Sequence, residues 1–364
     1  MEFALLVFQT VALLVILTVV VVNVFSVKQL ARQPASIGGP PVSLLIPARN
    51  EARNIESAVM SAMTQTYAPL DVWVLDDVSD DETPLLIERL KKRFPRLNCL
   101  RGRQPPLGWL GKPYACHQLA EVAKGEILIF MDCDVRLAPE AVARTVGYLQ
   151  QERLEFVSVF PHQDTVSWSE KLVVPLVSIM LYGFLPFPWI RRSTSPAFSA
   201  ASGQWMAIRA GTYRAVGGHG AVKNKVLEDI ELTRCIRTLG RPMDVVSGVD
   251  TVFCRMYRNT REVIEGFSKN AFASAQYHLL NFLGFLAFFV TVFLLPFGLL
   301  YTPLAWLPVS LVVLIKLTLA VRFRHEPVSF ILLHPLSVLF GIFIAVNSIR
   351  WYYTGCGHWK GRPV

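Results

Sequence analysis

The pattern of apolar and polar residues divides the chain into an apolar start, a mixed middle and an apolar end. Residues 3–25 are almost wholly apolar and are long enough to cross a bilayer as a helix. A cleaved signal peptide is the alternative, but Glu2 is acidic, the apolar run is too long, and no small-residue cleavage site follows it. We therefore expect a membrane anchor here. Further apolar runs long enough to span a membrane lie at 279–300, 303–321 and 328–349.

The middle of the chain has the pattern of an α/β domain. Short apolar runs bounded by glycine, proline or acidic residues predict strands, and stretches of helical pattern separate the first of them. This alternation predicts βαβ units and a Rossmann-like mixed, mainly parallel sheet. The expected strands lie at 42–46, 72–75, 127–134 and 155–160. Another strand, preceded by a small-residue turn, is expected within 202–209, and two shorter ones within 243–257.

Breaks in these patterns suggest the domain boundaries. Residues 172–190 are apolar but carry three prolines and are followed by two arginines. We expect them to form a helix at the membrane interface, although a buried helix under a loop fits the pattern equally well. The expected order is a transmembrane anchor at 1–27, a linker at 28–41, the α/β domain at 42–275, a C-terminal transmembrane region at 276–350 and a tail at 351–364.

Composition adds information about partners and compartment. Hydrophobic residues make up 52% of the chain, mean hydropathy is +0.40, and the formal net charge is +9. A positive charge suits nucleic acid or an anionic membrane surface. Because apolar runs flank the polar middle, we expect the membrane and an anionic nucleotide substrate, with no nucleic acid. The six cysteines are scattered without zinc-site spacing, which fits a reducing compartment.

Polar residues follow three of the expected strands. They lie at 47–51, 76–81 and 132–134, and ligands of parallel sheets bind beyond the carboxyl ends of the strands. Asp132 and Asp134 end one apolar run with the spacing i, i+2, so both can bind Mg²⁺ or Mn²⁺ and, through it, a diphosphate. A polar exit into a turn would explain such a pair in isolation. Convergence of three polar groups instead predicts a metal-dependent enzyme acting on a nucleotide diphosphate compound.

Three further positions are candidates for chemistry. Lys112, in a glycine-bearing loop at 107–113, and the backbone amides of the following helix could bind an anion, although the spacing is not that of a Walker loop. Glu228 and Asp229 open a helix, where acids can stabilise the helix terminus or act as a general base. His219 follows two glycines, which favours a positioning role over proton transfer.

These segments resemble the family 2 glycosyltransferases with the GT-A fold. The resemblance covers roughly residues 42–270 and is carried by LIPARNE at 45–51, VLDDVSDDET at 74–83, GK at 111–112, MDCD at 131–134 and ED at 228–229. It implies transfer of a sugar from a nucleotide sugar, with a UDP-sugar as the expected donor. The acceptor group would be a hydroxyl or a carboxylate, and the anomeric carbon would invert.

The resemblance also implies a role for each candidate residue. Lys112 would approach the diphosphate, Asp132 would meet the ribose or the metal, and Asp134 would bind Mg²⁺ or Mn²⁺. Asp229, preceded by Glu228, would be the catalytic base. The residues expected to hold the nucleoside are Pro47, Arg49, Glu51, Asp76 and Asp77.

Departures from the family pattern narrow the expected acceptor. The Q-x-x-R-W signature of processive polysaccharide synthases is missing from the region 258–270. Four segments are similar to bacterial carotenoid and hopanoid-associated glycosyltransferases: 203–204, 217–219, 265–270 and the terminal 359–362. We therefore expect a lipid acceptor such as a carotenoid or another terpenoid. A processive synthase is the alternative. A catalytically inactive scaffold is another, against which the presence of all the expected carboxylates argues.

The placement of basic residues predicts the orientation. Lys28 and Arg32 follow the first apolar run, so the positive-inside rule places the α/β domain in the cytosol of a multi-pass inner-membrane protein. Three C-terminal spans would then leave the basic residues after 349 outside, against the same rule. We therefore expect one C-terminal segment, either 328–349 or the part around Pro296, to re-enter or lie on the membrane.

Overall fold

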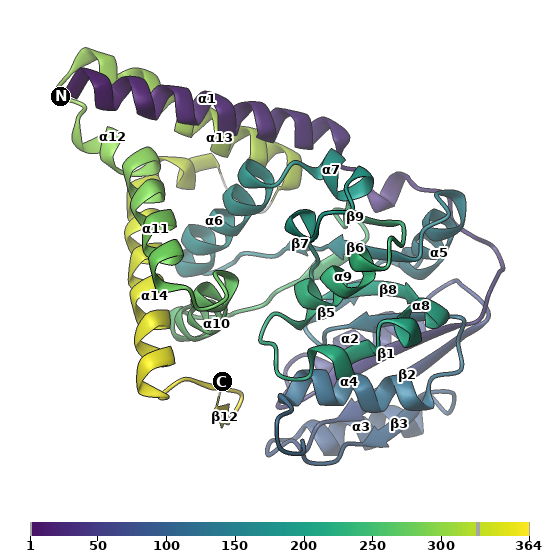
Figure 1. The fold of residues 1–364 in the computed structure, drawn as a ribbon. Helices are drawn as coiled ribbons and strands as arrows, with labels where there is room; N and C mark the ends of the chain where they lie inside the picture. The colour runs from purple at the N-terminus through teal and green to yellow at the C-terminus, as the bar shows by residue number, and fades with distance from the viewer. Residues whose placement is uncertain (1, 325–327, 364) are drawn as a thin grey trace. The chain divides into compact units, whose positions relative to one another are not determined.

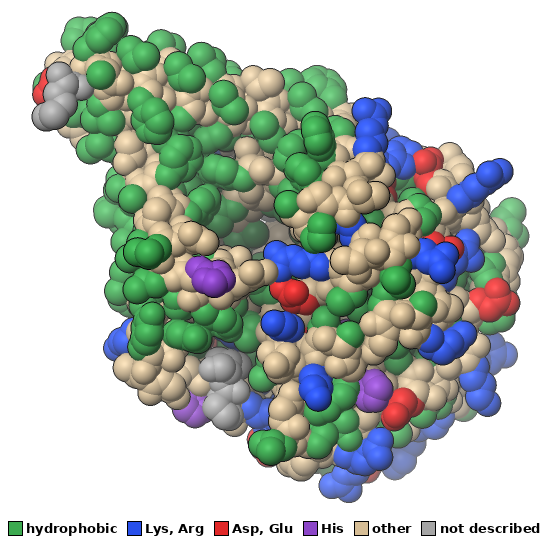
Figure 2. Space-filling model, in the orientation of Figure 1, with side chains coloured by type: hydrophobic (Ala, Val, Ile, Leu, Met, Phe, Trp, Pro, Cys, Tyr) green, Lys and Arg blue, Asp and Glu red, His purple; other side chains and the backbone are tan. Residues whose placement is uncertain are grey.

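The computed structural model describes residues 2–324 and 328–363. They form two compact units, each assembled from separate stretches of chain (Figure 1). The sheet unit comprises Val27–His162 and Trp189–Met256. The helical unit comprises Met1–Ser26, Gln163–Pro188 and Tyr257–Val364. In the view of Figure 2, hydrophobic side chains cover most of the helical unit, whereas lysine and arginine side chains gather over the sheet unit.

A seven-stranded sheet is the centre of the sheet unit. The strand order is β3-β2-β1-β4-β8-β6-β9, and all neighbours run parallel except at β8, which is antiparallel to both β4 and β6. This confirms the expected mixed, mainly parallel sheet. The strands are β1 Val42–Ala48, β2 Leu70–Asp76, β3 Asn98–Arg101, β4 Ile127–Met131, β6 Phe156–Phe160, β8 Trp205–Arg209 and β9 Met243–Ser247.

Helices cover both faces of this sheet, which explains why β4 is buried along its whole length. Alternate residues of one strand enter different cores: Leu44 and Ile46 pack on one side, and Leu45 packs on the other. The first core is closed by α2 Ile55–Met63, α3 Thr83–Arg93 and α5 Ala141–Gln151. The second is closed by α4 Gly111–Val122, α8 Ala210–Ala215 and α9 Glu228–Thr238.

Short elements complete the sheet unit. A second, three-stranded sheet has the order β5-β10-β7, and its strands are β5 Val135–Leu137, β10 Val252–Cys254 and β7 His162–Gln163. Three 3₁₀ turns are η1 Leu30–Arg32, η2 Pro196–Phe198 and η3 Gly218–Val222. The segment expected to be a linker therefore contains a structured turn, and Gln29 bridges to Ser247 at the end of β9.

The apolar segment 172–190 is divided between two helices. They are α6 Trp168–Phe184 and α7 Phe187–Arg192. Between them Leu185 has an extended backbone, because the residue before a proline, here Pro186, is sterically kept out of the helical conformation. The helix α6 begins at a capping box in which Ser167 and Glu170 satisfy each other's backbone amides.

The helical unit holds the long apolar helices. Among the described residues, three stretches are long and apolar enough to cross a membrane: Glu2–Ser26, Pro303–Phe323 and Val328–Thr354. The elements of this unit are α1 Glu2–Ser26, α10 Thr260–Ser274, α11 Leu279–Phe293, α12 Leu295–Gly298, η4 Pro303–Ala305, α13 Trp306–Phe323, η5 Val328–Leu333, α14 His334–Thr354, β11 His358–Trp359 and β12 Arg362–Pro363. In the helical unit, α1 and α13 run parallel, since Tyr301 donates to Glu2 (2.9 Å) at one end and Arg322 donates to the Val24 carbonyl (3.3 Å) at the other.

The run at 279–300 differs from the expected single span. Its helix α11 ends at Phe293, and the chain bends by 114° between α10 and α11. Pro296 lacks an N–H and cannot continue the hydrogen-bonding pattern, so the chain restarts as the short α12. Together α10 and α11 form either a broken span or a re-entrant pair, by length and composition.

Candidate active site

Two loops at the carboxyl edge of the sheet are joined by hydrogen bonds. The Asp77 amide donates to the carbonyl of Ala48 (2.7 Å), and the Arg49 guanidinium donates to the carbonyl of Asp77 (2.8 Å). The Glu51 amide donates to the Thr83 hydroxyl (2.8 Å). These bonds fix the loops after β1 and β2 as one structure, and Arg49 is part of that structure.

The nucleoside candidates are mostly buried in this double loop. Asp76 is 8% exposed, Asp77 3% and Glu51 6%. The Asp76 carboxylate accepts from the Ser79 amide (3.1 Å), so it stabilises its own turn. Pro47 is half-buried within β1. The structure therefore brings all five nucleoside candidates to the ends of β1 and β2.

A lysine and two acids from three elements form the centre of the site. The ammonium of Lys112, in the first turn of α4, lies 2.8 Å from Asp132 and 3.0 Å from Glu228. Asp132 follows β4 directly, and Glu228 is the first residue of α9. Only 6% of the Glu228 side chain is exposed, compared with 36% for Lys112. Each charge in this cluster is therefore paired inside a partly dry environment.

Asp229 lies beside this cluster and is held by backbone amides. Its Oδ2 accepts from the Gly203 amide (2.7 Å), and its Oδ1 accepts from the Ile230 amide (2.8 Å). A Cβ on Gly203 would lie 2.9 Å from Lys112 Nζ and 3.4 Å from Asp229 Oδ2. A side chain at position 203 would therefore push the flexible end of Lys112 away from this position. The sequence pattern identifies Gly203 as part of a small-residue turn but does not reveal this contact.

Burial and charge set the protonation of these groups. Burial disfavours the charged form of Lys112, but the charges of Asp132 and Glu228 outweigh this and hold its pKa well above the usual value. Burial, with the charge of Glu228, raises the pKa of Asp229 to about 6, against the opposing effects of Lys112 and the two amides. Asp229 is thus ionised at neutral pH with a proton affinity well suited to a general base.

The buried thiol of Cys116 on α4 lies near both Asp77 and the central cluster, because the charges of both affect its pKa. Cys116 is 1% exposed, and burial raises its pKa well above the usual value. Lys112 opposes this change, while the charges of Glu228, Asp132 and Asp77 add to it. Asp77, next to the end of β2, therefore acts on the same buried group as the acids of β4 and α9.

A second buried thiol, Cys254 of β10, lies among the remaining acids. Burial raises its pKa well above the usual value, and the charges of Asp134, Asp132 and Glu51 contribute, together with a hydrogen bond to Asp134. Gln204 donates to the sulfur from 3.0 Å. The structure thus gathers every acid expected at the site along one edge of the sheet unit.

Asp132 and Asp134 are the candidates for holding a divalent cation. Two carboxylates at the end of one strand supply hard oxygen donors, and Mg²⁺ beside a nucleotide usually takes only one or two carboxylates from the protein. Over residues 2–324 and 328–363, no cluster of three or more His, Cys, Asp or Glu side chains suited to a metal occurs. The donor set therefore fits a cation that takes its other ligands from the diphosphate and water.

His219 lies in the buried turn η3, which packs against two helices of the site. It is fully buried, its Nδ1 lies 2.8 Å from the Tyr213 hydroxyl, and burial lowers its pKa to about 3. A neutral ring of this kind does not exchange protons at physiological pH. Gly218 precedes it at φ +52°, and a Cβ there would lie 2.5 Å from the Tyr213 ring, so the glycine is required. The turn packs against α4 and α9, which carry Lys112 and the acid pair.

Comparison with known proteins gives a family and a fold for this chain. The sequence pattern of the family described as Glycosyl transferase family 2 matches residues 43–211. The 4,4'-diaponeurosporenoate glycosyltransferase of Staphylococcus haemolyticus is 25% identical over 232 residues, which are 63% of this chain and 60% of that protein. The chain thus matches less than two thirds of that relative. The beta-monoglucosyldiacylglycerol synthase of Trichormus variabilis is 31% identical over 122 residues, 33% of this chain and 26% of that protein.

Among solved structures, the mannosyltransferase PcManGT from Pyrobaculum calidifontis, in complex with GDP-Man and Mn²⁺, has a TM-score of 0.56 and 17% sequence identity. The likeness covers 96% of this chain and 99% of that one. It supports the fold. With the mainly parallel sheet, it confirms the GT-A fold expected from the sequence. Residues 43–211 of this chain therefore form a domain of the glycosyl transferase family 2.

Proposed function

We propose that this protein transfers a sugar from a nucleotide sugar to a lipophilic acceptor, with inversion at the anomeric carbon, on the cytosolic side of a membrane. The observation that carries the proposal is the cluster of Lys112, Asp132 and Glu228 beside Asp229. In this proposal the Lys112 ammonium acts on the leaving diphosphate, and the neighbouring Asp229 is the base for the incoming group. The names of two relatives, one acting on diaponeurosporenoate and one forming a glucosyldiacylglycerol, support an acceptor of lipid type.

In this proposal Asp229 accepts the proton of the acceptor hydroxyl as the hydroxyl attacks the sugar. The amides of Gly203 and Ile230 fix both carboxylate oxygens, so the base is oriented before the acceptor arrives. Its pKa of about 6 leaves it ionised at pH 7. Glu228 is a positioning residue, because its carboxylate binds Lys112 and its charge raises the proton affinity of Asp229.

Lys112 stabilises the departing diphosphate. It lies in the first turn of a helix, where backbone amides and the helix dipole also favour an anion. Because the ammonium is already held by two acids, little reorganisation is needed when negative charge develops. Mg²⁺ or Mn²⁺ held by Asp134 and Asp132 would neutralise further charge on the diphosphate.

The double loop after β1 and β2 would hold the nucleoside. Asp77 and Glu51 are buried acids, and carboxylates accept hydrogen bonds from base N–H groups and ribose hydroxyls. Uracil offers such an N–H, so a UDP-sugar is our proposed donor. Arg49 and Asp76 would act indirectly, since both are engaged in shaping the loops.

The membrane orientation follows from the ends of the apolar helices. Lys28 and Arg32 lie within six residues of the end of α1, and the positive-inside rule supports our proposal that the sheet unit is cytosolic. Because α1 and α13 run parallel, the chain between them must cross the bilayer an odd number of times if both are spans. We therefore infer that α11 takes part in a crossing.

The test is transfer by membranes that contain the wild-type or the Asp229→Asn protein. The membranes are incubated with a panel of radiolabelled nucleotide sugars, and the lipids are extracted into chloroform. We expect a labelled lipid from the wild type, and from Asp229→Asn unchanged donor binding with at least about 100-fold slower transfer. The matched control is Glu231→Gln, in the same helical turn, which should transfer normally. Full transfer by Asp229→Asn would remove the base from the proposal, and a ladder of long polymers would favour a processive synthase.

A further inference from the structure

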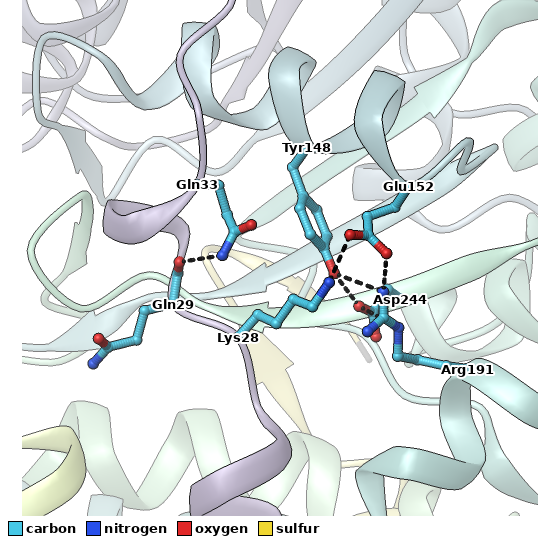
Figure 3. Close-up of polar contacts among 7 residues, drawn as sticks. All are labelled: Lys28, Gln29, Gln33, Tyr148, Glu152, Arg191 and Asp244. Carbon is cyan, nitrogen blue, oxygen red and sulfur yellow. Dashed lines mark hydrogen bonds and ion pairs between the residues drawn. The ribbon is translucent and has the colours of Figure 1, made fainter.

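A second polar cluster lies in the sheet unit outside the active site. Glu152 on α5 accepts from Lys28 (2.7 Å) and, through its other oxygen, from Arg191 of α7 (2.7 Å) (Figure 3). Arg191 also contacts Asp244 of β9 at 3.0 Å, and the Tyr148 hydroxyl donates to the same Asp244 carboxylate. One network therefore joins segments far apart in the chain.

The charges in this network are held firmly. Tyr148 is fully buried and Asp244 is 3% exposed. The hydrogen bond from Lys28 and the charges of Lys28 and Arg191 outweigh partial burial and lower the pKa of Glu152, so its carboxylate is ionised at neutral pH. A carboxylate that binds two cations through separate oxygens fixes both of them in space. Lys28 and Arg191 therefore lie close to each other, on the two oxygens of one carboxylate.

The network also lies where the chain passes between the two units. The sheet unit begins at Val27, directly after α1, and resumes at Trp189 within α7. Lys28 is two residues beyond the last residue of α1, so at most about 7 Å of chain separates it from the end of that helix. If α1 spans the bilayer, Lys28 must lie at the bilayer surface. Arg191 binds the same Glu152 carboxylate and therefore lies near that surface too.

The segment 190–199, which includes the end of α7, is held by hydrogen bonds from a buried arginine. Arg237, near the end of α9, is 4% exposed, and burial lowers its pKa. Its guanidinium donates to the carbonyls of Ile190 (2.9 Å) and Phe198 (3.1 Å), to the Ser199 hydroxyl (3.3 Å) and to the Ser193 carbonyl. Four hydrogen bonds from one buried side chain therefore hold the backbone of 190–199, and its outward side chains project from this held backbone.

Those outward side chains are aromatic and basic. Trp189 is 56% exposed, and its ring lies 5.2 Å from that of Phe198. Arg192 is exposed, and residues 187–201 contain no acidic residue. Tryptophan is the residue favoured at headgroup depth, and arginine is attracted to anionic lipid phosphates. A lone exposed tryptophan would need no explanation. Trp189, however, follows an apolar helix and lies two residues from Arg191, which is near the bilayer surface if α1 spans the bilayer.

We propose that residues 189–198 are a bilayer-contact loop of the sheet unit, with Trp189 and Phe198 in the headgroup region and Arg192 on anionic lipid phosphates. The proposal rests on α1 spanning the bilayer and not on the identity of the reaction. It gives the sheet unit its own contact with lipid, in addition to the membrane helices.

The test uses the full-length protein in lipid nanodiscs without donor or acceptor. The emission of Trp189 is obtained as the difference between the wild type and Trp189→Phe. We expect it to lose most of its intensity in discs of lipid brominated near the headgroup, and to resist aqueous acrylamide. The difference signal for Trp73→Phe, half-buried on β2, is the control and should not respond to brominated lipid.

Quenching of Trp189 by acrylamide without quenching by brominated lipid would overturn the proposal. Lipid quenching that appears only after an acceptor lipid is added would also overturn it, since it would assign the loop to acceptor binding. Because no transfer is measured, either failure leaves the proposed reaction untouched.

The role of Arg192 is tested by comparing equal fractions of brominated phosphatidylglycerol and brominated phosphatidylcholine. In the wild type the anionic lipid should quench Trp189 more strongly than the zwitterionic one. Arg192→Glu should abolish this excess, whereas Arg214→Glu, an exposed arginine on α8, should keep it. Equal quenching by both lipids in the wild type would remove Arg192 from the proposal.

Discussion

Replacement of Lys112 by methionine should change the pH dependence of transfer in a way that simple loss of binding would not. Lys112 stabilises the ionised form of Asp229, whose pKa burial raises to about 6. Without the ammonium, the carboxylate has a higher proton affinity and stays protonated to a higher pH. The rate depends on the ionised base, so the rise of kcat/KM with pH should move upward.

The size of this shift follows from the geometry at Gly203. Lys112 Nζ and Asp229 Oδ2 lie 2.9 and 3.4 Å from the position of a Cβ on this glycine, so at most about 6 Å separates them. At an effective dielectric constant of about 20, unit charges this far apart interact by about 3 kcal/mol, or ~2 pKa units. Because 36% of the Lys112 side chain is exposed, solvent screening reduces the expected shift to about 1 unit.

The assay is kcat/KM for the donor between pH 5 and pH 9, which reports ionisations of the free enzyme. The wild type should show its inflection near pH 6, and Lys112→Met about one unit higher, in addition to a lower plateau. Lys112→Arg keeps the charge and should keep the inflection. Glu228 and Asp229 are neighbours, so the measured value belongs to the pair. An inflection in Lys112→Met that stays at the wild-type pH, or moves down, would refute the electrostatic argument.

Three further changes have defined outcomes. Gly203→Ala should slow transfer by about 100-fold, because the added Cβ would lie 2.9 Å from the Lys112 ammonium and push it out of position. The control Gly211→Ala, whose Cβ would have nothing within 4 Å, should transfer normally. Chelation by EDTA should abolish transfer, and Mn²⁺ or Mg²⁺ should restore it in the wild type but not in Asp134→Ala; undiminished transfer in EDTA would exclude the metal role. Tyr148→Phe removes a hydrogen bond to the buried Asp244 carboxylate and should lower stability by about 1 kcal/mol, seen as a lower thermal midpoint with the active-site pH profile unchanged.

The sequence predicts the part of the site that depends on local pattern. The apolar runs of β1, β2 and β4 end in polar residues, and parallel neighbours bring such ends to one edge. That rule is sufficient to predict that Asp77 and Asp132, which are 55 residues apart in the sequence, lie at the same edge of the sheet. The acids at the start of α9 also suit a helix terminus, which local pattern alone could suggest.

Other features depend on tertiary contacts that local pattern does not encode. β8 is apolar like its neighbours, and nothing in its composition shows that it runs against them. Lys112 was expected in a loop but lies inside α4, because Pro113 is tolerated in the first turn of a helix. The close approach at Gly203 is to the ammonium of Lys112, a residue 91 positions earlier in the chain. Arg237 has the position of an ordinary cation at a helix end, yet it binds backbone carbonyls.

The division of the sheet unit into two stretches of chain has a consequence for biosynthesis. β4 and β6 are synthesised before Gln163–Pro188, but β8, which pairs with both, is synthesised after it. At usual elongation rates, roughly 2–10 s pass between completion of residue 162 and completion of β8. During this interval β4 offers an open edge to other nascent chains. Ribosome pausing within 163–204 should therefore reduce the yield of folded protein, and codon choice in that stretch should matter more than elsewhere in the gene.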